Sequence, residues 1–209
     1  MSSKGFFITL EGNEGCGKST QLRLLRDDLR RAGHNVLVTR EPGGTRAGDA
    51  IRAVLLDRKQ ARMNATCETL LYMASRAQLA AEVIRPALKA RRTVLCDRWV
   101  DATYAYQGFG GGVDRAWIRR LGLEATGGLE PDITLWLDLP LEAGLRRAAG
   151  RGPKDRVESK TLAYHRRVRR GYEDLARRQP RRFRRVRLNA SDSIEAVRAK
   201  VREALSDVL

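Results

Sequence analysis

Residues 6–20 read FFITLEGNEGCGKST, and this stretch decides the fold. A short apolar run typical of a buried strand ends at Leu10, and a helical pattern begins near Gln21. Between them, the segment from Gly12 to Ser19 has the spacing G-x-x-x-x-G-K-[ST]. In a strand-to-helix turn, this spacing surrounds phosphate oxygens with backbone N–H groups and a helix N-terminus. The stretch therefore predicts an α/β domain with a phosphate-binding loop.

The loop predicts where a nucleotide's phosphates bind. Lys18 supplies a cation to the β- and γ-phosphates, and the hydroxyl of Ser19 can bind Mg²⁺. Cys16 is either an activated thiol at the start of a helix or, as we favour, a small residue that fills a tight loop. The residues expected to contact the phosphate donor are Gly12, Asn13, Glu14, Gly15, Cys16, Gly17, Lys18, Ser19 and Thr20.

A metal ion at such a loop commonly has a second anchor, a carboxylate at the end of a neighbouring strand. Asp97, which closes the apolar run TVLCD, is the candidate. We expect Asp97 and Ser19 to hold Mg²⁺. A helix cap, or a structural pair with Arg98, is the alternative reading of Asp97.

Short apolar runs alternate with longer segments of helical period along the whole chain. The expected strands are 6–10, 35–39, 93–97, 132–139 and 183–188, and the expected helices are 18–32, 47–57, 66–90, 114–125, 140–149, 159–178 and 192–207. This alternation predicts parallel crossovers and a three-layer α/β fold. We expect one domain over 1–209. The segment GRGPKDR at 150–156, rich in glycine and charge, predicts a mobile lid at about 150–157.

Composition narrows the class of protein. The 209 residues are 42% hydrophobic and 32% charged, with no apolar run of membrane-spanning length. Three cysteines without metal or disulfide spacing agree with a reducing compartment, so we expect a cytoplasmic protein. The net charge of +16 fits a nucleic-acid surface or a protein that handles small anions. We interpret the run RRQPRRFRR at 177–185 as a solvated face, because no nucleic-acid motif accompanies it.

Four further stretches identify a family. They are TREPGGT (39–45), LLYMASRAQ (70–78), DRWVDATYAYQG (97–108) and GRGPKDRVE (150–158). In their order and spacing, together with the loop, they resemble thymidylate kinases, which transfer the γ-phosphoryl group of ATP to dTMP. The resemblance implies the P-loop nucleoside-monophosphate-kinase fold, with a five-stranded parallel sheet flanked by helices. It also implies Mg²⁺, the substrates ATP and dTMP, and a homodimer.

The resemblance assigns the base-binding part of the dTMP site. Tyr72 matches a position that is usually Phe, whose ring stacks on thymine. Arg76, one helical turn later, matches a contact to the thymine edge. Thr103 and Gln107 match residues that hydrogen-bond the base, and Tyr106 matches an aromatic residue near C2′ that disfavours a ribose hydroxyl.

The resemblance also assigns the sugar and phosphate contacts. Glu41, Arg52 and Arg98 match residues around the sugar and the acceptor phosphate. Glu14, a carboxylate inside the phosphate loop, matches a residue that reaches toward the 3′-hydroxyl of dTMP. Two positions depart from the family. Ala102 replaces a common serine, and Trp99 replaces a Tyr, Phe or His, so the hydrogen bonds at that turn are left open.

Phosphoryl transfer needs alignment and charge neutralisation more than a strong base. The expected catalytic residues are Lys18, Arg98, Arg151 and Arg156. The loop has Gly15 where some family members carry a catalytic arginine, so the chain resembles the bacterial type with its arginine in the lid. The alternative is that Arg151 and Arg156 are solvated lid charges.

Two other functions remain open from the sequence. One is a kinase of the same fold that acts on another nucleoside or nucleotide. The other is an ATP-dependent nucleic-acid-binding protein, for which the charge of +16 is the only support.

Overall fold

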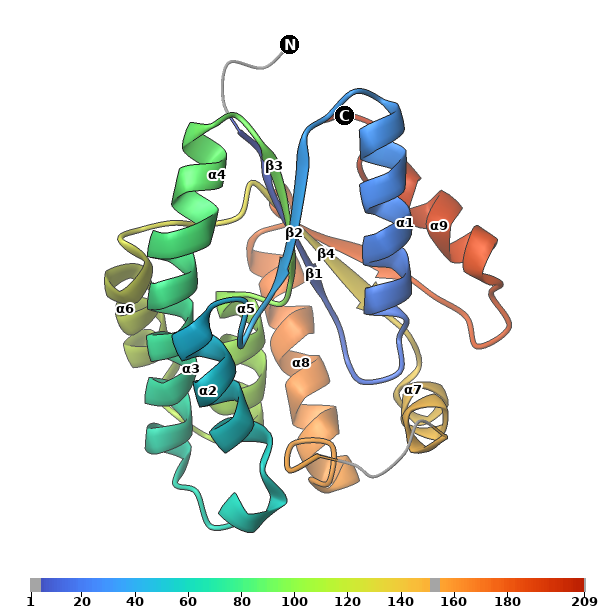
Figure 1. Cartoon of the computed structure of the whole chain (residues 1–209). Helices are drawn as coiled ribbons and strands as arrows, with labels where there is room; N and C mark the ends of the chain where they lie inside the picture. Colours follow the sequence, from blue (N-terminus) through green and yellow to red (C-terminus); the bar gives the residue numbers. More distant parts are fainter. Residues whose placement is uncertain (1–4, 151–154, 209) are drawn as a thin grey trace.

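The computed structural model describes residues 5–150 and 155–208. Five parallel strands form one sheet in the order β2-β3-β1-β4-β5. Their bounds are β1 (Phe7–Glu11), β2 (Val36–Arg40), β3 (Thr93–Asp97), β4 (Ile133–Asp138) and β5 (Phe183–Arg187). Figure 1 shows helices on both sides of this sheet. The predicted three-layer fold with a five-stranded parallel sheet is confirmed.

The helices cover the two faces unequally. The helices on the first side are α1 (Lys18–Arg31), α7 (Leu141–Ala149) and α9 (Ile194–Glu203). The helices on the other side are α2 (Arg46–Leu56), α3 (Ala65–Leu79), α4 (Arg85–Lys89), α5 (Val100–Thr103), α6 (Arg115–Thr126) and α8 (Leu162–Arg178). A 3₁₀ turn at Arg58–Gln60 follows α2. No helix of the described residues is long and apolar enough to cross a membrane.

Side chains of strand β1 pack into hydrophobic clusters on both faces of the sheet. Ile8 and Leu10 pack into the cluster under α1 and α9, whereas Phe7 packs edge to face on Trp99 with ring centroids 5.3 Å apart. Successive side chains of a strand point to opposite faces, so a continuous apolar run serves two layers. The same alternation sends Glu11 to the face covered by α8, where Tyr172 donates a hydrogen bond to it.

One helical segment differs from the sequence prediction. No element was expected between 98 and 113, yet α5 continues into a π-helical segment, Tyr104–Gly110. This segment packs closely on α8, where a Cβ on Gly171 would lie 2.8 Å from Cα of Ala105. Tertiary packing therefore stabilises a helix that local propensity did not predict. The predicted helix 66–90 is present as α3, a π-helical turn at Ala80–Ile84, and α4.

Candidate active site

The loop between β1 and α1 lies against the backbone of two neighbouring segments. A Cβ on Gly12 would be 2.7 Å from the carbonyl oxygen of Leu137, and one on Gly15 would be 2.0 Å from that of Gly144. Both glycines also have positive φ angles, 142° and 71°. Position 15 therefore has no room for an arginine side chain in this conformation, which agrees with an arginine supplied from elsewhere.

Lys18 closes the loop from its helical side. Its Nζ donates to the carbonyl oxygens of Gly12 at 3.0 Å and Asn13 at 3.2 Å. The N-cap of α1, Gly17, provides no side-chain hydrogen bond, so the first N–H groups of the helix are left for an anion. Ser19 is exposed and Thr20 is half-buried in the same first turn. The loop thus has the geometry of a phosphate site.

Cys16 lies in the core rather than at the phosphate face. Its side chain is 2% exposed and belongs to the cluster of Ile8, Leu10 and Leu22. This burial favours the role of a small filling residue over that of an activated thiol.

Glu14 turns its carboxylate away from the loop and toward a neighbouring cavity. Its Oε1 accepts a 2.7 Å hydrogen bond from the hydroxyl of Tyr106 and lies 3.4 Å from Nη2 of Arg98. Burial opposes ionisation, but Arg98, Lys18 and the Tyr106 hydrogen bond hold the pKa of Glu14 below its ordinary value. Its Oε2 lies 3.5 Å from Nδ1 of the buried His165. The residue is therefore a carboxylate at neutral pH.

One cavity beside the loop brings together every residue that the resemblance assigned to dTMP. They are Glu14, Glu41, Arg52, Tyr72, Arg76, Arg98, Thr103, Tyr106 and Gln107. They come from the loop, the β2–α2 connection, α2, α3 and the segment after β3, so only the tertiary structure makes them neighbours. Lys18 lines the same cavity, which places it at the boundary between the two halves of the site.

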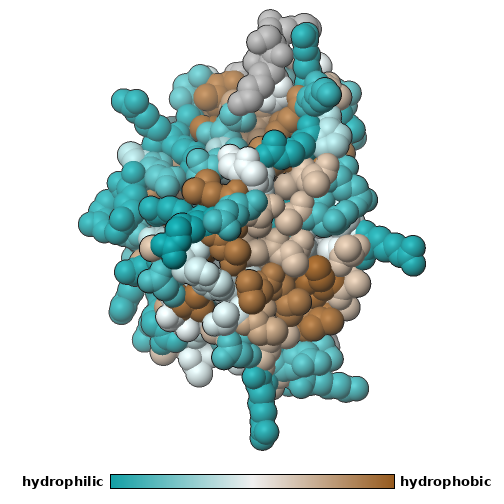
Figure 2. All heavy atoms as spheres, turned by 90° about the vertical axis from the view of Figure 1, so that its left-hand side faces the viewer, coloured by the Kyte–Doolittle hydropathy of each residue, from teal (hydrophilic) through white to brown (hydrophobic). Residues whose placement is uncertain are grey.

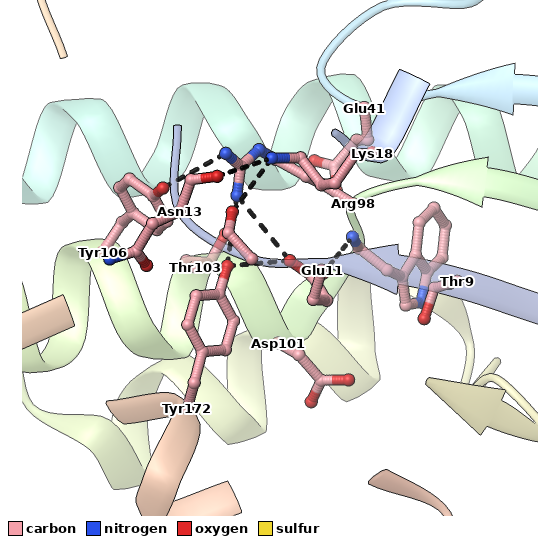
Figure 3. A network of polar contacts seen from close by, with 12 residues as sticks. Thr9, Glu11, Asn13, Lys18, Glu41, Arg98, Asp101, Thr103, Tyr106 and Tyr172 are labelled. Atoms are coloured by element: carbon pink, nitrogen blue, oxygen red, sulfur yellow. Dashed lines mark hydrogen bonds and ion pairs between the residues drawn. The ribbon is translucent and has the colours of Figure 1, made fainter. Parts of the chain in front are cut away.

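Arg98 lies at the centre of the polar network in Figure 3. Its Nη1 and Nη2 donate to the hydroxyls of Tyr172 and Tyr106, each at 3.1 Å. Burial opposes its charge, but Tyr106, Tyr172, Glu14 and Glu11 hold the pKa of Arg98 well above its ordinary value. Its φ of 72° is in the left-handed region, which is uncommon for a residue other than glycine. The guanidinium is a fixed cation at the cavity wall.

Arg76 forms a buried ion pair at the far wall of the cavity. Its Nε and Nη2 donate to Oε2 of Glu41 at 2.9 and 2.7 Å, and Nη2 also donates to Oγ1 of Thr103 at 2.8 Å. Burial raises the pKa of Glu41, although Arg76 opposes that shift. Arg52, half-buried, donates from Nη1 to the carbonyl of Pro42 at 2.9 Å. The ion pair between Glu41 and Arg76 thus joins the β2–α2 connection to helix α3 at this wall of the cavity.

The positions that departed from the family have clear places in the structure. Trp99 is fully buried, donates its Nε1–H to the carbonyl of Leu129 at 3.3 Å, and packs on Phe7. Its backbone N–H donates to Oε1 of Glu11 at 2.8 Å. Ala102 lines the cavity without a polar group. Trp99 therefore serves packing, while Ala102 leaves a small apolar patch beside the acceptor residues.

Asp97 ends β3 with one oxygen unused. Its Oδ1 is buried and has no hydrogen-bond partner among residues 5–150 and 155–208. Arg98, proposed as its alternative partner, contacts Glu11 and Glu14 instead. A carboxylate oxygen without a protein partner is suited to a divalent cation. The residues present thus fit a magnesium site at this strand end.

Arg156 is buried rather than solvated. It is 4% exposed, its Nη1 donates to Oε2 of Glu68 at 2.7 Å, and its Nε donates to the carbonyl of Leu55 at 2.8 Å. The alternative that Arg156 is a solvated lid charge is therefore wrong. Arg151 lies outside the described residues, so its role stays a prediction. Sequence reasoning missed Glu68, although it precedes Tyr72 by one helical turn on α3.

The arginine run 177–185 is solvated in part, as the sequence predicted, because Arg177, Arg178, Arg181 and Arg185 are exposed. Arg182 and Arg184 are half-buried, and ion pairs extend beyond this solvated face. Arg182 donates to both carboxylate oxygens of Asp101 at 2.8 Å, and Arg185 lies 2.6 Å from Asp138. Asp101 is buried, and a buried carboxylate needs a paired cation, so the guanidinium of Arg182 lies against it. Part of the positive charge thus serves internal ion pairs.

Comparison with known proteins completes the assignment. The family model described as thymidylate kinase matches residues 10–201. A thymidylate kinase from Deinococcus radiodurans is 50% identical over 205 residues, which cover 98% of each chain. One from Gloeobacter violaceus is 51% identical over 201 residues, covering 95% of this chain and 93% of the relative. A crystal structure of thymidylate kinase from Ehrlichia chaffeensis has a TM-score of 0.77 at 31% identity and covers 97% of this chain and 98% of that one.

These similarities extend over both halves of the site and nearly the whole chain. They confirm the resemblance drawn from the sequence motifs and the expected enzyme class, an ATP-dependent phosphotransferase. The chain belongs to the thymidylate kinase family.

Proposed function

We propose that the two halves of the site divide the family's reaction, the phosphorylation of dTMP by ATP, between them. The loop from Gly12 to Thr20 binds the phosphates of ATP, and the cavity beside it binds dTMP. The observation that carries this assignment is that all nine residues matched to dTMP line that single cavity. Lys18, at the boundary, contacts the phosphoryl group that moves.

The charges of the site divide the work of alignment. The ionised Glu14 accepts a hydrogen bond from the 3′-hydroxyl of dTMP, while Arg98 and Arg52 bind the acceptor phosphate. Arg156 acts on the charge of the transferring phosphoryl group. Its Nη2 is buried without a partner in the described part of the chain, which leaves that N–H group for an anion. Residues 150–157, Arg151 included, act as a lid that excludes water.

Asp97 and Ser19 would hold Mg²⁺, with the remaining positions left to water and phosphate oxygens. The described residues contain no group of three or more His, Cys, Asp or Glu side chains arranged to hold a metal ion. This is typical of Mg²⁺ sites that depend on substrate phosphates. When bound, the ion neutralises charge on the β- and γ-phosphates.

The protein acts as one domain per chain and as a homodimer in the cytoplasm. Exposed apolar side chains support the dimer, because Val54 of α2, Leu70 of α3 and Leu123 of α6 are 44–46% exposed on neighbouring helices. Figure 2 shows brown, hydrophobic atoms gathered on the face that these helices form. Patches of this kind commonly mark protein interfaces.

A coupled assay of ADP release tests the assignment. The acceptors are dTMP, dUMP, dCMP, dGMP, dAMP and thymidine, each with ATP and Mg²⁺. We expect dTMP to have the highest kcat/KM. Preferential use of another base, or of the unphosphorylated nucleoside, would contradict the proposal and favour another kinase of the same fold. Nucleic-acid-stimulated ATPase activity without phosphorylated dTMP would favour the nucleic-acid-binding alternative.

A further inference from the structure

Glu68 on α3 links Gln107, matched to the base, with Arg156 of the lid. The side chain is buried, with a residue exposure of 6%. Its Oε1 accepts a 2.7 Å hydrogen bond from Nε2 of Gln107, and its Oε2 accepts one of 2.7 Å from Nη1 of Arg156. Each carboxylate oxygen thus has one strong partner. One is a base-reading residue and the other is the lid arginine.

The carboxylate decides which way the Gln107 amide points. An ionised carboxylate only accepts hydrogen bonds, so it must face the NH₂ group of the amide and not its carbonyl. Reversing the amide would place two acceptor oxygens in contact inside a buried site. Arg156 supports this arrangement, because its charge offsets the cost of burying the carboxylate of Glu68. The amide therefore has one stable orientation.

This orientation has a consequence for the base. Gln107 lines the acceptor cavity, and Nε2 is engaged by Glu68, so the carbonyl Oε1 is the acceptor left to face a bound base. Thymine and uracil carry a hydrogen on N3, whereas cytosine carries a lone pair there. A carbonyl aimed at N3 attracts the first two and repels the third. A reversed amide would instead match cytosine, with its NH₂ toward N3 and its carbonyl toward the N4 amino group.

We propose that Glu68 is a specificity-determining positioning residue, which admits pyrimidine monophosphates with an N3–H group by locking the Gln107 carbonyl toward the base. It touches no reacting atom and acts through Gln107. This inference rests on the proposed function, since it concerns the acceptor of the same site. It explains why a buried carboxylate, rather than an apolar residue, stands one turn before Tyr72 on α3.

The test compares selectivity in the isosteric variant Glu68→Gln. The neutral amide can donate to or accept from Gln107, so either orientation becomes possible. We expect the ratio of kcat/KM for dTMP to that for dCMP to fall at least about tenfold, as for the loss of one hydrogen bond to a charged group. The KM for ATP should stay within about twofold. Glu82→Gln, at an exposed glutamate that accepts a hydrogen bond from Gln78 on the same helical segment, is the matched control and should keep the wild-type ratio.

The outcomes separate the inference from the function beneath it. If the wild-type protein does not phosphorylate dTMP, the proposed function fails. If it does, but Glu68→Gln lowers kcat/KM for dTMP and dCMP by the same factor, Glu68 is merely structural and the inference is wrong. Should Glu68→Gln not fold because Arg156 is left unpaired, the double variant Glu68→Gln/Arg156→Met removes that charge. Its ratio of dTMP to dCMP should fall by the same factor, because a slower phosphoryl transfer affects both acceptors alike. An unchanged ratio there overturns the inference.

Discussion

The hydroxyl of Tyr106 donates a 2.7 Å hydrogen bond to Oε1 of Glu14, while the ring of Tyr106 lies 4.8 Å from the guanidinium carbon of Arg98. One aromatic side chain thus contacts both the anion, Glu14, and the cation, Arg98, of the proposed acceptor site. Its stack with Arg98 is a cation–π contact, and its hydroxyl also accepts from Nη2 of Arg98 at 3.1 Å. Replacing Tyr106 by Phe therefore removes the hydrogen bonds of the hydroxyl and keeps the cation–π contact of the ring with Arg98.

Tyr106→Phe keeps the ring but loses the hydrogen bond to Glu14. We expect kcat/KM for dTMP to fall about tenfold, because a buried carboxylate loses its closest donor, while the KM for ATP changes little. Steady-state kinetics with each substrate varied in turn measures both. Tyr104→Phe is the control, since the Tyr104 hydroxyl binds Asp174 outside the cavity. Equal losses in the two variants would contradict the special role of Tyr106.

Glu14→Gln removes the negative charge that faces the acceptor. We expect the KM for dTMP to rise by about tenfold or more and the Kd for ATP to change less, because the carboxylate points into the cavity proposed to bind dTMP and away from the loop's phosphate face. Binding of ATP and of dTMP is measured separately by calorimetry. A loss of affinity that is the same for both nucleotides would count against the role of Glu14 as an acceptor contact.

Arg156→Ala removes the guanidinium of the lid. We expect kcat to fall on the order of 10³-fold, as for other arginines that stabilise phosphoryl-transfer charge. Arg151→Ala, measured in parallel, ranks the two lid arginines. Circular dichroism and thermal unfolding check that each variant is folded. A folded Arg156→Ala protein with nearly wild-type kcat would refute the catalytic role of Arg156.

Glu11 is expected to make the stability of the fold depend on pH. Burial is the main cause that raises the pKa of this carboxyl from 4.5 to about 7, with Arg98, Trp99 and Tyr172 opposing the shift. Between these two pKa values the unfolded chain loses the proton that the folded chain keeps, so the free energy of unfolding falls as pH rises. Above about pH 7 this loss is complete.

Glu11→Gln cannot titrate, and its amide keeps an acceptor for the backbone N–H of Trp99. We therefore expect Tm of the variant minus Tm of the wild type to increase by several degrees from about pH 5 to about pH 8. Differential scanning calorimetry across this range gives both curves. A difference that is independent of pH would show that Glu11 has the same protonation state in the folded and unfolded chains.

The dimer proposal is tested with charges on the apolar face. Leu70→Glu and Leu123→Glu each place a carboxylate among exposed apolar side chains of α3 and α6, so we expect them to dissociate the dimer to monomers. Sedimentation velocity at micromolar concentration measures the mass. Leu162→Glu, at a similarly exposed leucine of α8, should leave the dimer intact. A wild-type protein that is monomeric at every concentration would remove the proposal.

Much of the fold followed from local patterns. The expected ranges matched all five strands to within about one residue. The central strands β1, β3 and β4 are buried on both faces and need a continuous apolar run, whereas the edge strands β2 and β5 alternate buried and more exposed residues. The helical segment Val100–Gly110 was not predicted, because packing on Gly171 of α8 stabilises it. The residues matched to the acceptor came from the family motifs, while the structure added Asp155, Val157 and Glu158 to the lining of the cavity. It also added Glu68, which accepts a hydrogen bond from Gln107.

Chain chemistry alone established the phosphate loop, since its glycines, lysine and serine act over eight consecutive residues from Gly12 to Ser19 and need only a strand before them and a helix after them. It also established the order of strands and helices along the chain. Only the tertiary structure decided which carboxylate each buried arginine pairs with. Arg156 and Arg182 look alike in sequence, but one meets Glu68 and the other Asp101. Such pairs form between residues far apart in the chain, because a buried charge is stable only where folding brings its partner.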